Sequence, residues 1–365
     1  MTRISGLLLS LATIFGATAL LLSVSKNPQA NSIWCLAHFC DSANPTITTD
    51  PLNPFLTADY AELLQQRNQM KEAENQFLSA VKKGPNIPPI LIRTANFYIA
   101  QDQFKKALPY LMRILALTRV YNDIIFSYYR RSGLSMETLI AEGLPLDDSK
   151  PANAFLTVLI DSKDSAAPLL WQHIQKKWGA EPELHVKWVN HLFQSKQYLL
   201  ADRYWRQFIK EPDGNKISNP AFATKPTGSL LDWVITPDKH VEITQLANGG
   251  IQLIFEGVEN TNFANITQFV VVEPGTYTVN VEVETDRIST NEGLRFRLYD
   301  PSQGKVDSTT DPLLGTNSLR KVSIEATIGP ETPFVAFTVV RRPSERFDNQ
   351  IRGKAIIYSV VMTRK

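Results

Sequence analysis

The chain has 365 residues, which is enough for two or three domains that each bury a core of their own. Hydrophobic residues make up 43% and charged residues 20%, a composition typical of globular proteins rather than disordered ones. The formal net charge is +2, with 23 basic against 19 acidic residues up to Lys216 and 15 against 17 after it. Neither part has the basic excess of a nucleic-acid-binding protein, so we predict no nucleic-acid partner.

An uncharged run of 21 residues, 4–24, lies at the N-terminus. As a helix it would span about 31 Å, enough to cross a bilayer core. Arg3 precedes the run and favours a cytoplasmic N-terminus, with the rest of the chain on the far side. Residues 1–25 are therefore predicted to be a transmembrane anchor or a signal segment. We expect a single-pass protein of the bacterial inner membrane, with most of the chain in the periplasm.

A cleaved signal peptide is the alternative for the same run. Ala17-Thr18-Ala19 has the small residues of a cleavage site, although Leu20, Leu21 and Leu22 continue the apolar run beyond it. Both alternatives place the rest of the chain outside the cytoplasm.

Residues 26–55 are predicted to be a linker, because 44–54 contains three prolines. This segment contains the two cysteines of the chain, Cys35 and Cys40. An oxidising compartment would allow them to form a disulfide across a short loop. A metal site would need further ligands besides these two and His38, so we predict none.

Apolar residues follow a helical period from Leu56 to Lys210, and the pattern repeats every 34 positions. The repeating positions are Ala61, Leu64, Ala73, Phe77 and Ala80, then Ala95, Tyr98, Ala107, Leu111 and Ile114, and in a third copy Trp188, Leu192, Ala201, Trp205 and Phe208. Small residues fall where two helices would cross closely, and large apolar residues fill the space between them. The pattern predicts pairs of antiparallel helices.

The period, the small residues and the closing Pro85 resemble the tetratricopeptide repeat, a helix–turn–helix unit. The resemblance covers Thr57 to Pro212 and is blurred over 122–178, where prolines divide the chain into shorter helices. The first two units lack the early tryptophan of the family. The resemblance implies a helical solenoid over 56–212 with a groove that binds a protein partner. A rigid spacer without a ligand is the alternative.

Beyond the turn-rich segment 211–215 the pattern changes to strands and turns. Strands are predicted at 241–246, 251–256, 266–273, 277–284, 294–299, 319–328, 334–340 and 354–363. Alternation in the fourth strand directs Tyr277 and Val279 to one face and Glu282 and Glu284 to the other. Val270, Val271 and Val272 form a continuous apolar run, which predicts a strand covered on both faces. Residues 217–365 are therefore predicted to form an antiparallel two-sheet β-sandwich, and the whole chain a multidomain α + β protein.

Several segments resemble the jelly-roll carbohydrate-binding modules of the galactose-binding-like group. They are Asn219-Pro220-Ala221-Phe222, Leu231-Asp232-Trp233, Gln268 with Glu273-Pro274-Gly275-Thr276-Tyr277, and Ile357-Tyr358-Ser359-Val360. The resemblance covers 217–365 and implies a jelly roll that binds a glycan. Tyr358-Ser359 stands where these modules often have an acidic pair, which puts in doubt the structural calcium of many relatives. We predict no cofactor.

Arg295, Arg297 and Tyr299 are predicted to share one face of a strand and are the first candidates for a ligand site. Arginine offers a fork of donors to hydroxyls or carboxylates, and a tyrosine ring can stack on a sugar. An edge strand guarded by charge is the alternative explanation. Trp233 is a second candidate platform for a sugar, and an aromatic plug of the sandwich core is its alternative.

Enzymatic motifs are missing from the sequence. None of the five histidines belongs to an HExxH motif, and there is neither a nucleophile elbow nor a phosphate-binding loop. Glycoside hydrolysis needs two carboxylates facing each other across a cleft, whereas Glu282 and Glu284 lie on one strand face. We therefore predict no enzyme.

The combined prediction is a non-catalytic membrane-anchored periplasmic scaffold. Its helical repeats would bind a protein partner and its sandwich a glycan or another subunit, in envelope polysaccharide assembly or export. A purely structural protein–protein adaptor without sugar binding is the alternative.

Overall fold

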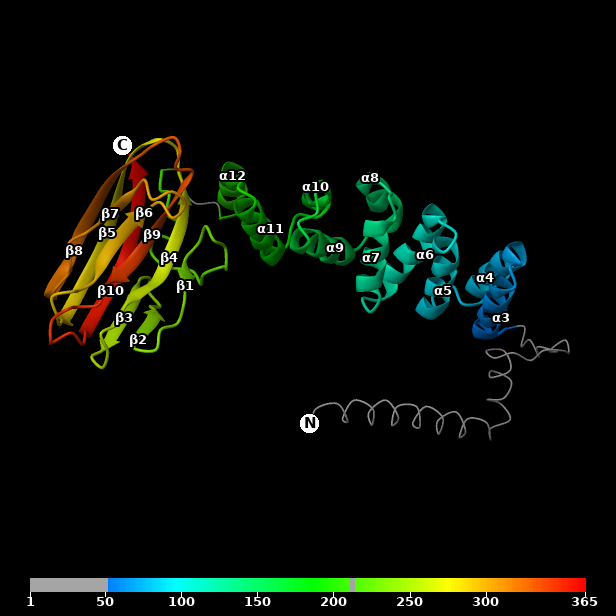
Figure 1. The fold of residues 1–365 in the computed structure, drawn as a ribbon, viewed down its shortest axis with the longest axis horizontal. Coiled ribbons are helices and arrows are strands. Elements are labelled where there is room, and N and C mark those ends of the chain that lie inside the picture. The colour runs from blue at the N-terminus through cyan, green and yellow to red at the C-terminus, as the bar shows by residue number, and fades with distance from the viewer. Residues whose placement is uncertain (1–51, 210–213) are drawn as a thin grey trace, which may run out of the picture. The chain divides into compact units, whose positions relative to one another are not determined.

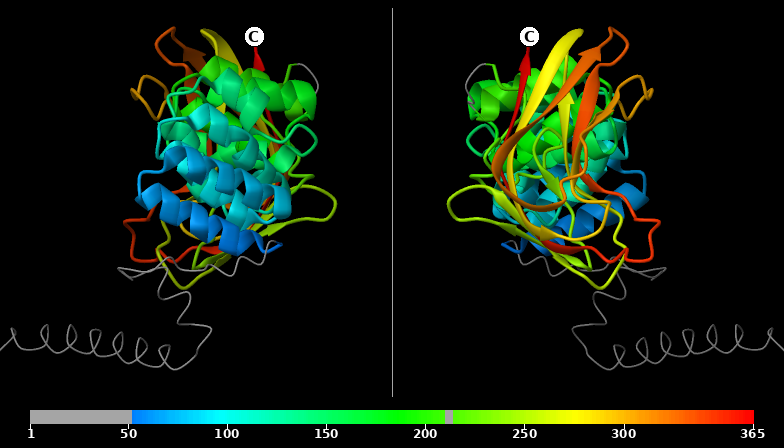
Figure 2. Two further views of the ribbon diagram at one scale, coloured as in Figure 1. Left: turned by 90° about the vertical axis from the view of Figure 1, so that its right-hand side faces the viewer. Right: turned by 90° about the vertical axis from the view of Figure 1, so that its left-hand side faces the viewer.

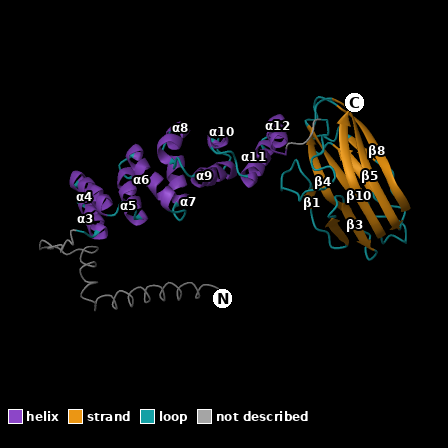
Figure 3. Ribbon diagram, turned by 180° about the vertical axis from the view of Figure 1, so that it is seen from behind, coloured by secondary structure: helices purple, strands orange, loops and turns teal. Residues whose placement is uncertain are grey.

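The computed structural model describes residues 52–209 and 214–365, with helices in the first range and strands in the second (Figures 1 and 3). The change from helix to strand falls where the sequence predicts it. The predicted span 4–24 and the predicted disulfide between Cys35 and Cys40 lie outside the described residues. Within these ranges, no helix is long and apolar enough to cross a membrane.

Proline and asparagine mark the beginnings of several helices. Asn53 caps the first described helix, because its Oδ1 accepts a hydrogen bond from the N–H of Phe55 at 2.9 Å. Pro54, Pro88 and Pro182 occupy first positions, where a missing N–H costs nothing. The helices are α3 (Pro54–Gln66), α4 (Met70–Lys83), α5 (Pro88–Ile99), α6 (Phe104–Leu117), α7 (Asn122–Arg131), α8 (Met136–Thr138), the π-helical turn η1 (Leu139–Gly143), α9 (Ser149–Asp161), α10 (Ala167–Lys177), α11 (Pro182–Gln194) and α12 (Tyr198–Ile209).

Four of these helices end in the same way. Asn68, Asp102, Lys163 and Lys196 follow α3, α5, α9 and α11 with φ between 53° and 62°, in the left-handed region. In each case the N–H of the next residue bonds, at 2.8 or 2.9 Å, to the carbonyl five positions before it, as Gln69 does to Leu64. This is a Schellman-type cap, which turns the chain into the following helix.

The predicted helical pairs are confirmed. The small positions of the first two units, among them Ala61, Ala73, Ala95 and Ala107, are fully buried. The sequence does not indicate the four caps, because none of the four residues is glycine, the usual residue at this position of a helix cap. Membership of the tetratricopeptide family and the solenoid shape stay predictions.

The chain divides into two compact units. The first comprises residues up to 159 together with 163–174. The second comprises 160–162 and 175–365, so that α11 and α12 belong to the same unit as the strands. Each unit is considered by itself below.

Within residues 214–365, ten strands form two antiparallel five-stranded sheets packed face to face, as predicted. One sheet has the order β1-β4-β9-β6-β7, and the other has the order β2-β3-β10-β5-β8. The strands are β1 (Val234–Ile235), β2 (Val241–Gln245), β3 (Ile251–Glu256), β4 (Phe263–Val271), β5 (Gly275–Ile288), β6 (Arg295–Tyr299), β7 (Asp307–Thr309), β8 (Gly315–Ile328), β9 (Phe334–Arg341) and β10 (Arg352–Arg364). The chain crosses between the sheets after β1, β3, β4, β5, β7, β8 and β9, which gives the two Greek keys of a jelly roll.

Alternate residues of both sheets fill the space between them. Tyr277, Val279, Val281 and Val283 of β5 are fully buried in this core, as the sequence predicts. Val270 to Val272 are also buried, so the prediction of a strand covered on both faces is confirmed. The sequence analysis missed β1 and β7, because two or three residues are too few to show alternation.

The hairpin of α11 and α12 covers one end of the outer face of the β1-β4-β9-β6-β7 sheet. The ring of Phe193 lies 5.7 Å from Phe269 and 4.9 Å from Phe334, and the ring of Tyr198 lies 4.9 Å from Phe334. The Nε1 of Trp205 donates a hydrogen bond of 2.8 Å to the Oγ of Ser218. We call Phe193, Tyr198, Phe269 and Phe334 the hairpin cluster.

Replacing Phe193 by alanine should lower the free energy of unfolding by about 3 kcal/mol, because it leaves a cavity in the hairpin cluster. The matched control is Leu199→Ala on the same hairpin, where the side chain is 66% exposed and the expected loss is below about 0.5 kcal/mol. Chemical denaturation followed by tryptophan fluorescence measures both. Equal losses for the two variants would show that the cluster does not hold the hairpin on the sheet.

Candidate functional site

Arg297 and Tyr299 lie together on the outer face of the β1-β4-β9-β6-β7 sheet, as predicted, but the guanidinium of Arg297 is already engaged. The guanidinium of Arg297 lies 4.3 Å from the centre of the Tyr299 ring. It also donates two hydrogen bonds, of 2.7 and 2.8 Å, to the carboxylate of Asp307. This bond, together with the charge of Arg297, lowers the pKa of Asp307. The guanidinium therefore stacks on the ring that we expected to hold a sugar.

Arg295 is engaged in the same way. It pairs with Glu292 at 3.0 Å and donates to the carbonyl of Thr310 at 3.2 Å. The alternative explanation, an edge strand guarded by charge, is wrong, because β6 lies between β9 and β7. Ligand binding by Arg295, Arg297 and Tyr299 stays a prediction. The contacts of the two guanidinium groups leave few N–H donors for a ligand.

The structure corrects the prediction that Trp233 is a sugar platform. Its side chain is only 1% exposed, with Phe222 stacked at 4.4 Å and Phe337 edge-on at 6.0 Å. Its Nε1 donates to the carbonyl of Asn219 at 2.9 Å. A ring covered in this way cannot stack on a ligand, so Trp233 is the core plug of the alternative prediction.

The outer face of the other sheet, β2-β3-β10-β5-β8, is polar and carries a different set of groups. The right-hand view of Figure 2 shows the strands of the sandwich. Outward positions follow from the alternation and register of the strands; they include Glu242, Thr244, Gln252, Ile254, Ile356, Tyr358, Ser359, Asn280, Glu282, Glu284, Lys321, Ser323 and Glu325.

Tyr358 lies at an irregularity of β10. The pairing register with β5 shifts between Ile357 and Ser359, so Tyr358 is the extra residue of a β-bulge. A bulge re-aims side chains and is frequent next to functional sites. Gly250, with φ of 91°, borders this position, and a Cβ there would come within 3.0 Å of the Ile357 carbonyl oxygen and 3.7 Å of the Tyr358 ring. Glycine therefore leaves room beside the ring.

Carboxylates and hydroxyls surround the Tyr358 ring. The Ser359 hydroxyl donates to Glu282 at 2.9 Å. A hydrogen bond to the Glu284 carboxylate raises the pKa of Tyr358 above its usual value. Beside them, the Ser323 hydroxyl donates to Asn280 at 2.8 Å. We call Tyr358, Ser359, Glu282, Glu284 and Asn280 the Tyr358 face.

This arrangement suits the binding of a hydroxyl-rich ligand. An aromatic ring can stack on the C–H face of a sugar, while carboxylates and amides beside it bond to the hydroxyls. Glu282 and Glu284 come from the same strand and both bond to β10, so they do not face each other across a cleft as hydrolysis requires. Glu282 and Glu284 therefore do not have the arrangement of the two carboxylates of a glycosidase.

The sequence alone does not bring these residues together. In the sequence Tyr358-Ser359 stand only at the place of a missing acidic pair, and Glu282 and Glu284 are predicted on one strand face away from the core. These residues lie together only because β10 pairs with β5 in the register that places Ser359 opposite Glu282 and Ile356 opposite Glu284. No pattern within either segment predicts that register.

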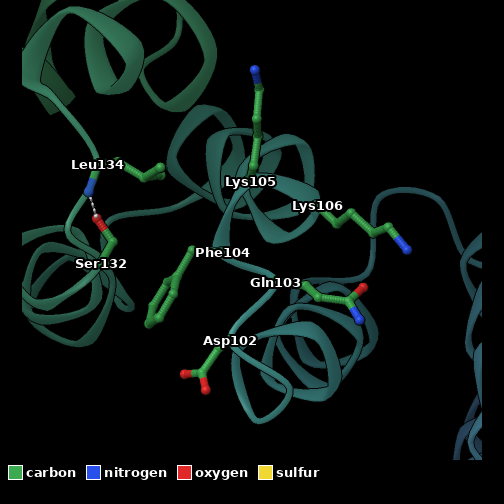
Figure 4. Close-up of a pocket in the computed structure, with 7 residues that line it drawn as sticks. All are labelled: Asp102, Gln103, Phe104, Lys105, Lys106, Ser132 and Leu134. Carbon is green, nitrogen blue, oxygen red and sulfur yellow. Dashed lines mark hydrogen bonds between the residues drawn. The ribbon is translucent and has the colours of Figure 1, made fainter.

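A pocket of about 420 Å³ in the helical part is a weaker candidate (Figure 4). It lies between the α5–α6 turn and the end of α7 and is lined by Asp102, Gln103, Phe104, Lys105, Lys106, Ser132 and Leu134. Lys105 and Lys106 extend away from the Phe104 ring in Figure 4 and pair with Glu142 and Glu74, at 3.4 and 3.5 Å. The charged groups therefore do not converge on the pocket.

The described residues contain no group of three His, Cys, Asp or Glu side chains that could hold a metal ion. Asp300 is a buried carboxylate of the sandwich, a side chain of the type that can bind a metal ion. Burial raises its pKa, but bonds from Ser302, Gln303 and Thr332 outweigh this and lower the pKa to about 2. Its oxygens are thus committed to the turn after β6 and to Thr332 between β8 and β9.

Comparison with known proteins finds no matching family model and no matching curated protein. Solved structures similar to the C-terminal part include TmCBM61 in complex with beta-1,4-galactotriose, with 19% identity over 41% of this chain and 99% of that one and a TM-score of 0.29. The xylan-binding CBM22-1 domain from Paenibacillus barcinonensis has 11% identity over 42% and 97%, with a TM-score of 0.28. A cyclase from Fischerella sp. TAU has 14% identity over 42% and 96%, with a TM-score of 0.29. At such values the argument for function rests on the geometry of the chain itself.

The bond between Tyr358 and Glu284 can be tested by titration. Because an adjacent carboxylate disfavours the phenolate, Glu284→Gln should lower the pKa of Tyr358 toward the usual value of about 10. The ultraviolet absorbance of the phenolate measures it, with the signal of Tyr358 isolated by subtracting the titration of Tyr358→Phe. Glu242→Gln, on a distant strand of the same sheet, is the control and should cause no shift. An unchanged pKa in Glu284→Gln would contradict the geometry.

Proposed function

We propose that this chain is a non-catalytic glycan-binding protein whose sandwich binds a polysaccharide through the Tyr358 face. The observation that carries the proposal is the position of Tyr358 at a bulge beside Gly250, with Glu284 and the Ser359–Glu282 pair next to it. A sheet face of this kind can lie along an extended sugar chain. Weak stacking and hydrogen bonds then add up over several sugar units.

We further propose that the helical part binds a protein partner and that residues 4–24 hold the chain on the inner membrane, with the bulk in the periplasm. Support for the first proposal is the 34-residue repeat with its common caps, which is typical of tetratricopeptide-like arrays. Support for the second is the uncharged run itself. Together with glycan binding, this layout suits a scaffold in envelope polysaccharide assembly or export.

One observation favours the alternative, a protein–protein adaptor without sugar binding. The hairpin cluster shows that an outer face of this sandwich accepts aromatic side chains from helices. The other outer face would then bind a helical protein instead of a glycan. The binding experiment below distinguishes the two functions.

A glycan array probed with the full-length chain tests the proposal, with β-1,4-galactans, xylan and cello-oligosaccharides among the probes. We expect binding that Tyr358→Ala weakens at least tenfold, about 1.4 kcal/mol, because the stacking platform is lost. Tyr358→Phe should keep most of the affinity. Tyr299→Ala, on the other sheet, is the matched control and should bind as the unaltered chain does. Folded protein that binds no glycan would favour the adaptor.

A further inference from the structure

Strand β8 forms a long open edge of the β2-β3-β10-β5-β8 sheet. It runs over 14 residues, Gly315–Ile328, and pairs with β5 only. In the part of the chain that the structure describes, no strand lies beyond it. The edge strands at the other three ends, β1, β2 and β7, have 2, 5 and 3 residues. Long unpaired edges are templates for a further strand.

The register shows which backbone groups of β8 are unused. Lys365, which follows β10, donates its N–H to the carbonyl of Thr276 in β5 at 2.9 Å. Alternate residues of a strand form their backbone hydrogen bonds with opposite neighbouring strands. In this part of β5, even-numbered residues therefore bond to β10 and odd-numbered residues bond to β8. Val281 pairs with Val322, and Val279 with Ile324. From Arg320 to Ile328, before the register shifts, the even-numbered residues of β8 therefore bond to β5. The N–H and C=O groups of its odd-numbered residues face the open edge.

The middle of this edge is complementary to itself. It reads Lys321-Val322-Ser323-Ile324-Glu325. If a second copy pairs antiparallel about Ser323, Lys321 lies opposite Glu325 and Val322 lies opposite Ile324. The exposed Leu319, at 58%, then lies opposite Thr327. An axis through Lys321 or Glu325 would instead place like charges opposite each other, which is destabilising.

Hydrogen bonding agrees with the same register. The pairs 321–325 and 323–323 join odd-numbered residues, and these are residues whose backbone groups face the edge. Each such pair exchanges two N–H···O bonds in an antiparallel ladder. The bonding parity and the charge pattern, which are independent of each other, thus select one arrangement.

We propose that two copies of this chain associate through β8, antiparallel about Ser323, and form one continuous ten-stranded sheet. Charged residues on an edge strand usually prevent such pairing. Here Lys321 meets the carboxylate of Glu325 of the second copy, which also pairs with Lys365 of its own chain at 2.5 Å. The charges that would guard the edge thus favour a second copy of this chain. The two-fold axis is perpendicular to the sheet, so both Tyr358 faces lie on the same side. The dimer does not depend on glycan binding, but it would offer a long polymer two sites and hence avidity.

Charge exchange tests the interface. Sedimentation of the full-length chain in detergent solution should show a dimer that Lys321→Glu weakens at least tenfold, because two glutamates then face each other. The double variant Lys321→Glu with Glu325→Lys should recover the dimer, since opposite charges face each other again. A chain that is monomeric at all concentrations overturns the proposal. A dimer indifferent to both changes overturns it as well.

Cross-linking tests the register. Ser323→Cys, with Cys35 and Cys40 replaced by serine, places two thiols on a directly opposed pair with Cα atoms about 5.5 Å apart, within disulfide range. The matched control, Thr327→Cys, lies about 26 Å from its own copy, as eight residues of strand. Oxidation should cross-link the first variant and not the second. Equal cross-linking of both would refute this register.

Discussion

Alternation of side chains across two packed sheets is the constraint on which the rest of this molecule depends. In β5, Tyr277 to Val283 place every second residue in the core with no exposure. Because the period of a strand is two, this burial fixes Glu282 and Glu284 on the outside. A shift of the register by one residue would bury the carboxylates and expose the valines. The outer faces are thus as strictly determined as the core, and they hold the candidate sites.

The two outer faces of the sandwich carry different groups. On one, α11 and α12 cover Phe269 and Phe334 through the hairpin cluster, and farther along Arg295 and Arg297 are engaged by Glu292 and Asp307. On the other, hydroxyls and carboxylates bond across β5 and β10 around an aromatic ring that a bulge re-aims. The charges of the first face are paired and its apolar end is covered. The polar groups of the Tyr358 face also bond to one another, but they lie beside an aromatic ring of the kind that can stack on a sugar.

The sequence predicted the parts of this fold that depend on local periodicity. Ile251–Glu256 was predicted with the bounds that the structure has, and the other long strands differ by a few residues at their ends. The strands of two or three residues, β1 and β7, were not predicted. The ion pair between Arg297 and Asp307 of β7 was therefore not predicted either. The burial of Trp233 depends on Phe222 and Phe337, which lie in other segments of the chain. Tyr358 and Glu284 are 74 positions apart, and only the long-range register joins them.

A crystal structure of the chain with a bound oligosaccharide, taken from the strongest glycan on the array, tests the central claim most directly. The account predicts a sugar ring stacked on Tyr358, with its hydroxyls bonded to Glu282 or Glu284. A sugar bound at Arg297 and Tyr299, or held by the helical part alone, would contradict it.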